Sequence, residues 1–92
     1  MIEVKKKGAD EFLVIVTEAD SKTEHNVALN DAYYQRLTQG KIPKEELIKK
    51  SFRFLLKREP KESILSKFDL RIIKGYFPEY EEKMKRGFNV EE

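Results

Sequence analysis

The sequence predicts an α+β domain in which a three-stranded antiparallel meander is followed by four or five helices packed on one face. Up to Leu29, apolar residues either alternate with polar ones or form one short β-branched run, which is typical of strands. Beyond Leu29 they recur at the spacing of amphipathic helices. The 92 residues leave no room for a second domain. We therefore expect a single domain, with a sheet over residues 1–29, helices over 30–86 and a frayed tail over 87–92.

The three strands are predicted from their side-chain patterns. Ile2 and Val4 alternate with charged residues, as in a strand with one buried face. The run Phe12–Val16 is apolar throughout, so it is expected to be central, with both faces covered or with one face against a second copy. Thr23–Leu29 alternates again, after a polar turn segment. Because the core of so short a chain is small, this pattern favours a homodimer.

Two helices are predicted to follow the strands. Asn30 is a favourable N-cap and Gly40 a favourable residue after a helix, so they bound a helix over Asp31–Thr38. Pro43 opens a second helix over Lys44–Arg58, with acidic residues in its first turn. The apolar face of this helix is formed by Leu47, Ile48, Phe52, Leu55 and Leu56. We expect the two helices to cover the strand residues Val14, Val16, Val27 and Leu29.

Three shorter helices are predicted after these, each opened by a proline or by an N-cap aspartate. Their ranges are Lys61–Lys67, Leu70–Lys74 and Glu79–Arg86. Gly75 is expected to close the second of them and Gly87 the third.

Charge is distributed unevenly along the chain, although the total is only +2. Residues 1–35 carry four basic and seven acidic side chains, residues 36–74 twelve and five, and residues 75–92 three and five. The corresponding net charges are −3, +7 and −2. Such a basic middle suits contact with a polyanion, or with the acidic ends of this chain or of a second copy.

The composition disfavours catalysis. Cysteine is absent, which excludes disulfides, a thiol nucleophile and thiolate metal sites. The only histidine is His25, whose neighbours Glu24 and Asn26 point to the opposite face of the predicted strand, so a structural role is favoured. There is no Ser-His-Asp order, Gly-rich phosphate loop or metal-spaced cluster. We expect no enzymatic activity, no cofactor and no metal.

The sequence also gives an expectation for localisation. No apolar run approaches the roughly 18 residues that a membrane-spanning helix needs. The first residues lack the apolar core of a signal peptide. We expect a cytoplasmic protein that does not bind membranes.

A basic stripe on the second predicted helix is a candidate nucleic-acid site. It consists of Lys49, Lys50, Arg53 and Lys57, opposite the apolar face. Phosphates suit such a stripe, but a solvated outer face has the same composition. Arg71 and Lys74 extend it if Glu62–Phe77 forms a helix-turn-helix around Phe68 and Asp69. The second helix of that unit is rich in Leu and Ile, which is more typical of a core than of base recognition.

Aromatic residues gather near the last predicted helix junction. These are Tyr76, Phe77 and Tyr80. So dense a group is suited to anchoring a partner protein, and equally suited to folding back over the sheet.

The stretch Arg58–Leu65, Arg-Glu-Pro-Lys-Glu-Ser-Ile-Leu, is the most specific part of a resemblance to a group of short bacterial proteins of unknown function. The resemblance extends over most of the chain, including the aromatic group above. That group of proteins has no assigned activity, so the resemblance implies no functional residues. Pro60 itself indicates a helix junction, at which Glu59 or Glu62 is expected to pair with Arg58.

Part of the chain also resembles ribbon-helix-helix proteins, in the order of a strand over Thr23–Leu29 and helices over Asp31–Thr38 and Lys44–Arg58. Such proteins dimerise and place a two-stranded ribbon in the major groove of DNA. Here neither face of the strand carries Lys or Arg, and Phe12–Val16 is expected to pair along its edge.

The leading hypothesis is a small non-catalytic binding or adaptor module that acts through protein contacts, with itself or with another protein. The alternative is a helix-turn-helix-like or ribbon-helix-helix-like nucleic-acid-binding protein that uses the basic stripe with Arg71 and Lys74. The two differ in the salt dependence of binding to DNA.

Overall fold

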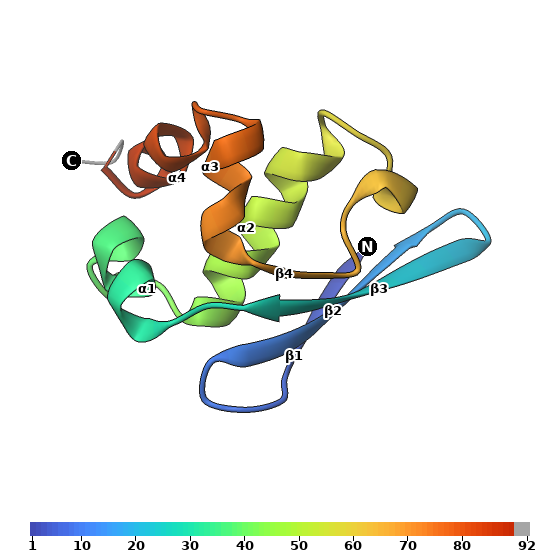
Figure 1. Cartoon of the computed structure of the whole chain (residues 1–92), viewed down its shortest axis with the longest axis horizontal. Coiled ribbons are helices and arrows are strands. Elements are labelled where there is room, and N and C mark those ends of the chain that lie inside the picture. The colour runs from blue at the N-terminus through green and yellow to red at the C-terminus, as the bar shows by residue number, and fades with distance from the viewer. Residues whose placement is uncertain (90–92) are drawn as a thin grey trace.

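The computed structural model describes the backbone of residues 1–89 and the side chains of residues 1–86. Over these residues the chain forms a four-stranded sheet, four α-helices and two 3₁₀ turns (Figure 1). All four helices lie on the same side of the sheet in this view. The predicted α+β class is therefore confirmed. The sheet is mixed, however, and has one strand more than the predicted antiparallel meander.

The first three strands pair in antiparallel order, as the alternation in the sequence predicts. They are β1 (Ile2–Lys6), β2 (Glu11–Glu18) and β3 (Ser21–Ala28). One face of the sheet is turned toward the helices and buries every second residue of β2. The buried residues of β2 on this face are Phe12, Val14 and Val16.

The other face of the meander is open. Here β2 presents Leu13 and Ile15, which are half-buried. The register places Glu3 and Glu24 beside Ile15, and Lys5 beside Leu13. The stems of long charged side chains cover apolar surface of this kind, as on the solvated face of many antiparallel sheets. The homodimer expected from the apolar pattern of β2 stays a prediction.

The predicted helix over Lys61–Lys67 is wrong, because the chain there leads into a fourth strand, β4 (Lys67–Asp69). Helical backbone there is limited to the 3₁₀ turn η1 (Lys61–Ser63). The chain is extended after it, and the Asn26 N–H donates to the Ser66 carbonyl at 2.7 Å. Pairing with β3 is parallel, which requires the long helical connection that α1 and α2 supply.

The strand β4 is at odds with both DNA-binding folds that the sequence resembles. Phe68 and Asp69 belong to β4, so Glu62–Phe77 does not form two helices around a turn. β3 lies between β2 and β4, and each of its edges is paired with a strand of the same chain. The two-stranded ribbon of a ribbon-helix-helix dimer needs an open edge at that position.

The two longer helices follow the prediction closely. Helix α1 spans Asp31–Thr38, and the Asn30 side chain accepts a hydrogen bond from the Tyr33 N–H at its N-terminus. Helix α2 spans Lys44–Leu56, slightly shorter than expected. Its apolar face is buried against the sheet. Val14, Val16 and Val27 of the strands, and Leu29 directly after β3, are at most 2% exposed.

The last helical segments differ more from the prediction. Asp69 caps η2 (Leu70–Ile72) through a hydrogen bond from the Arg71 N–H, as expected. The chain continues through α3 (Ile73–Tyr76), which includes Gly75, into α4 (Tyr80–Asn89). Gly87 is helical, so it does not end α4. Residues 90–92 of the expected frayed tail lie outside the described residues.

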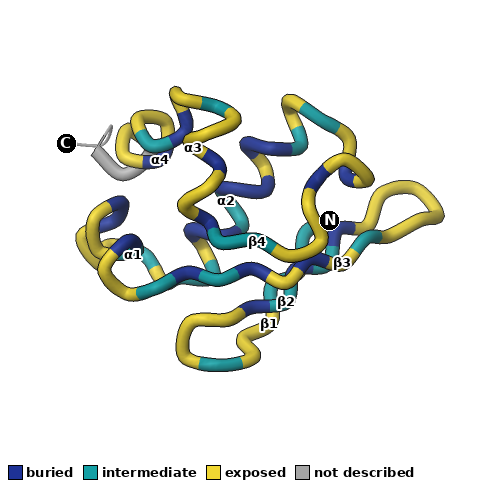
Figure 2. Tube along the Cα trace, in the orientation of Figure 1, coloured by how far each residue is buried: buried dark blue, intermediate teal, exposed yellow. Residues whose placement is uncertain are grey.

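Buried residues collect between the sheet and the helices, and the hairpin turns are exposed (Figure 2). Helix α2 packs on β1 and α4, and α1 packs on α4. Within residues 1–89, none of the helices combines the length and hydropathy needed to cross a bilayer.

Candidate protein-docking groove

An apolar groove of about 150 Å³ opens where the C-terminal end of α2 meets η1, β4 and α3. Eight of the ten residues that line it are apolar. The lining consists of Leu55, Glu59, Ser63, Ile64, Leu65, Phe68, Ile72, Ile73, Tyr76 and Phe77. We call this set the apolar groove.

The apolar groove gathers the exposed large hydrophobic side chains of the domain. Among the described residues four such side chains are exposed, and three of them line the groove: Leu65 at 47%, Ile72 at 37% and Tyr76 at 68%. The fourth is Met1. Scattered exposed apolar residues are ordinary on soluble proteins, whereas a contiguous set around a cavity is a candidate interaction site.

Leu65 is held in its exposed position by hydrogen bonds to its own carbonyl and to the carbonyl that follows it. Its carbonyl oxygen lies 2.8 Å from Nδ1 of His25, and the next carbonyl, that of Ser66, accepts from the Asn26 N–H. A carbonyl can only accept, so His25 donates from Nδ1. In the neutral ring, Nε2 then accepts from the Thr23 hydroxyl, which lies 2.8 Å away.

His25 is therefore a structural residue that joins β3 to the edge of the groove. It is 1% exposed, and its ring packs against Phe52 of α2 with 5.3 Å between centroids. The Leu65 carbonyl and the Thr23 hydroxyl together account for both ring nitrogens.

Phe77, another residue of the apolar groove, is held by a second cluster. Its ring meets Phe54 edge-to-face at 5.8 Å, and the Arg58 guanidinium stacks on Phe54 at 3.6 Å from the ring centroid. Arg58 Nε also pairs with Glu79 at 3.2 Å. The expected pairing of Arg58 with Glu59 or Glu62 is therefore wrong, because Glu79 reaches the guanidinium from the segment before α4.

Glu59 is the acidic residue in the groove wall. It is half-buried, and its carboxylate forms no hydrogen bond or ion pair among the described residues. Neighbouring acids differ: Glu62 pairs with Lys61 at 2.8 Å, and Glu79 pairs with Arg58. The groove thus carries one uncompensated negative charge.

Of the aromatic group singled out from the sequence, the structure brings two members to the groove and puts the third in the core. Tyr76 and Phe77 line the groove, but Tyr80 is 0% exposed. The Tyr80 hydroxyl lies 2.6 Å from Oγ of Ser51, which in turn donates to the Leu47 carbonyl. Burial raises the pKa of the Tyr80 hydroxyl, and the hydrogen bond with Ser51 offsets this only in part. Tyr80 is therefore unavailable to a partner.

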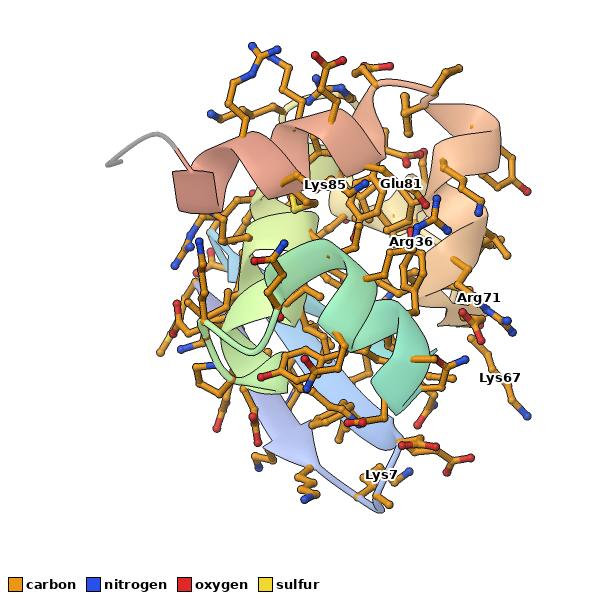
Figure 3. The ribbon with its side chains drawn as sticks, turned by 90° about the vertical axis from the view of Figure 1, so that its left-hand side faces the viewer. Lys7, Arg36, Lys67, Arg71, Glu81 and Lys85 are labelled. Atoms are coloured by element: carbon orange, nitrogen blue, oxygen red, sulfur yellow. The ribbon has the colours of Figure 1, made fainter. Side chains whose placement is uncertain are left out.

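A three-element ion cluster supports α3, which supplies much of the groove. The Glu81 carboxylate accepts a 2.8 Å hydrogen bond from the Tyr33 hydroxyl and pairs with Arg36 at 3.2 Å and Lys74 at 3.5 Å. Figure 3 shows Arg36 and Glu81 facing each other between α1 and α4. Burial alone would raise the pKa of Glu81, but the Tyr33 hydrogen bond and the two cations outweigh it, so the pKa is lowered.

The six basic residues singled out from the sequence do not have equal surroundings. Lys49, Lys50, Arg53 and Lys57 lie along α2 or at its end, away from the buried face. Arg71, by contrast, forms a two-pronged contact with Asp69, and Lys74 belongs to the Glu81 cluster. Lys67 and Arg71 point outward at the edge of the molecule (Figure 3). Arg71 and Lys74 therefore each have an acidic partner, and their predicted role in the stripe stays a prediction.

Sequence reasoning did not single out four important groove residues: Glu59 as an unpaired charge, and Leu65, Ile72 and Ile73 as part of a surface. The Leu70–Ile73 run looked like a core pattern, but Ile72 is partly exposed. No pattern in the sequence distinguishes Ile72 from its buried neighbours, because the distinction depends on where β4 and α3 lie.

Over the described residues, no group of three or more His, Asp or Glu side chains is arranged to hold a metal ion. No protein-family model matches the chain, and neither a curated protein nor a solved structure matches it. The apolar groove is consequently the feature from which a function can be inferred.

Proposed function

We propose that this domain is a non-catalytic adaptor module that docks a short segment of another protein in the apolar groove. The observation that supports this most is the gathering of Leu65, Ile72 and Tyr76 around one cavity. Interface hot spots cluster in well-packed pockets that exclude water, and Tyr is among the side chains enriched in them. Leaving three such side chains in water costs hydrophobic free energy, at about 25 cal/mol per Å² of apolar surface.

The size of the groove sets the kind of occupant. A cavity of about 150 Å³ lined by Leu, Ile and Phe accepts a benzene-sized group. One Leu, Met or Phe side chain of a partner is of that size. The occupant we propose is therefore a short segment with a single large apolar anchor, whose flanks cover Leu65 and Tyr76.

The hydrogen bonds at Leu65 and the aromatic cluster at Phe77 fix these two groove residues before a partner binds. A wall already fixed before docking loses less conformational entropy when the partner arrives. Selectivity for an anchor of one size follows from the same rigidity.

A random dodecapeptide library displayed on phage tests the proposal. Selection on the wild-type domain is compared with selection on the double variant Leu65→Ser, Tyr76→Ser. The control is Leu13→Ser, Ile15→Ser, which removes apolar side chains from the open face of the sheet. We expect peptides with a large apolar residue to be enriched on the wild type and on the control, but not on the groove variant. Equal enrichment on all three would overturn the proposal.

A second candidate function is nucleic-acid binding through the basic stripe. It is favoured by one observation: Lys49, Arg53 and Lys57 form no ion pair among the described residues, unlike Arg71 and Lys74. Random duplex and single-stranded DNA, titrated at low and moderate salt, are the probes. A phosphate binder loses about 0.9 log unit of affinity per contacted phosphate for each log unit of salt on duplex DNA. Changing the four stripe residues to Glu should abolish such binding, and absence of binding at low salt would exclude this candidate.

A further inference from the structure

We propose that the segment docked in the apolar groove carries a Lys or Arg next to its apolar anchor, and that this cation pairs with Glu59. This inference rests on the docking function proposed above and specifies the chemistry of the partner. It starts from the one carboxylate in the groove wall, which is half-buried and lacks a partner among the described residues.

The surroundings of Glu59 leave its charge uncompensated. Two of the three basic residues nearest in the chain are already engaged: Arg58 with Glu79, and Lys61 with Glu62. The third, Lys57, is exposed at the end of α2 and forms no ion pair with Glu59. Lys74, on the α3 side of the groove, is engaged by Glu81. Arg58, Lys61 and Lys74 therefore cannot pair with Glu59 without giving up their own partners.

Docking would carry a desolvation cost at the Glu59 carboxylate unless the partner neutralises its charge. An apolar segment laid over the groove removes water from the Glu59 carboxylate, and a desolvated, unpaired carboxylate opposes binding. A cation on the segment restores the lost interactions. The same contact selects against neutral and acidic segments, because they would bury the charge without a partner.

The geometry therefore assigns two parts to the recognised sequence. A large apolar side chain fills the cavity among Leu55, Ile64, Phe68 and Ile73. A neighbouring basic side chain meets Glu59 at the end of α2. The apolar part supplies most of the affinity, and the basic part supplies selectivity.

Repeating the library selection on Glu59→Lys tests this inference. Glu18→Lys is the control, because it makes the same change in net charge at an exposed position at the end of β2, away from the groove. We expect peptides from the wild type and from the control to pair an apolar anchor with Lys or Arg, and peptides from Glu59→Lys to replace that cation with Asp or Glu.

A single synthetic peptide from the wild-type selection makes the test quantitative. Its affinity should fall on the order of 30-fold on Glu59→Lys, and should recover when its basic residue is changed to Glu. If selected peptides depend on Leu65 and Tyr76 but show no charge preference that Glu59→Lys reverses, this inference is overturned and the docking function stands. If no peptide depends on Leu65 and Tyr76, or if the domain binds only a second copy of itself there, the docking function and this inference both fail.

Discussion

The Nδ1 atom of His25 lies 2.8 Å from the carbonyl oxygen of Leu65. This contact connects a buried ring in the middle of β3 to a leucine that is 47% exposed. The single histidine of the chain thus holds Leu65, a residue of the apolar groove, in position. The parallel pairing of β4 with β3 begins at the adjacent residue, Ser66.

Replacing His25 by Ala is expected to destabilise the domain by about 3 kcal/mol, because it leaves a cavity and an unsatisfied carbonyl at Leu65. Thr23→Val, which removes only the hydroxyl on the other ring nitrogen, should cost about 1 kcal/mol. Urea unfolding measures both. Hydrogen exchange at Asn26, whose N–H donates to the Ser66 carbonyl, should accelerate in the His25 variant more than exchange in β1, and equal acceleration at Asn26 and in β1 would contradict the bracing role.

The buried hydroxyl pair of Tyr80 and Ser51 should respond unequally to removal of either member. Ser51→Ala leaves the Tyr80 hydroxyl buried without a partner, which costs about 2 kcal/mol, whereas Tyr80→Phe leaves Ser51 bonded to Leu47 and costs about 1 kcal/mol. The double variant should be more stable than Ser51→Ala alone. Because the Ser51 hydroxyl donates to the Leu47 carbonyl, Tyr80 is the donor to Ser51. Thermal unfolding of the three variants gives the order, and a larger loss for Tyr80→Phe than for Ser51→Ala would refute this assignment.

Glu81 should contribute to stability in a pH-dependent way. Its pKa is lowered from the ordinary value of 4.5 in the folded protein. A carboxyl group of this kind stabilises the fold above its unfolded pKa, and the contribution is lost as the pH falls through the folded pKa. Glu81→Gln is therefore expected to be about 2 kcal/mol less stable than the wild type at pH 7, with the difference shrinking at acid pH.

Chemical denaturation of the wild type and Glu81→Gln at pH 7 and at pH 3 checks this expectation. Glu82→Gln is the matched control, because Glu82 lies next to Glu81 on α4 but is exposed and pairs only with Arg86. An exposed pair contributes roughly 0–1 kcal/mol, so the control should stay close to the wild type at both values. If Glu81→Gln lowers the free energy of unfolding equally at both pH values, the charge of Glu81 does not contribute to stability.

The exposed groove residues should affect binding far more than stability. Tyr76→Ser changes a side chain that is 68% exposed, so the free energy of unfolding should shift by less than about 0.5 kcal/mol. Binding of a selected peptide should nevertheless weaken by about tenfold or more, as for a hot-spot aromatic residue. Isothermal titration together with thermal unfolding separates the two effects; a loss of binding that parallels a loss of stability would point to misfolding instead.

The sequence predicts the meander and the two longer helices because their signals are local. Alternation in β1 and β3, the Asn30 cap and the apolar face of α2 each depend on residues close in the chain. β4 has no such signal: three residues, Lys67–Asp69, become a strand only because β3 offers an open edge far away in sequence. Local patterns contain no information about that edge.

The site was predictable only in part for the same reason. Tyr76 and Phe77 stand out as a dense aromatic group, but Tyr80, three residues on, turns into the core with Ser51. Leu65 lines the groove because its carbonyl is held by His25, and Glu59 stands out because its carboxylate has no partner among the described residues. Both features arise only when η1, β4 and α3 surround the end of α2. Arg71 and Lys74 differ from the other residues of the predicted stripe because they pair with Asp69 and Glu81, which sequence patterns do not indicate.

The most direct test of the central claim is an amide chemical-shift map of the ¹⁵N-labelled domain during titration with a peptide from the wild-type selection. Docking in the apolar groove predicts that the largest shifts fall on residues 63–68 and 72–77, while the outer face of α2 and the open face of the sheet change little. Shifts centred on Lys49, Arg53 and Lys57, or on Leu13 and Ile15, would contradict the account and move the binding surface elsewhere on the domain.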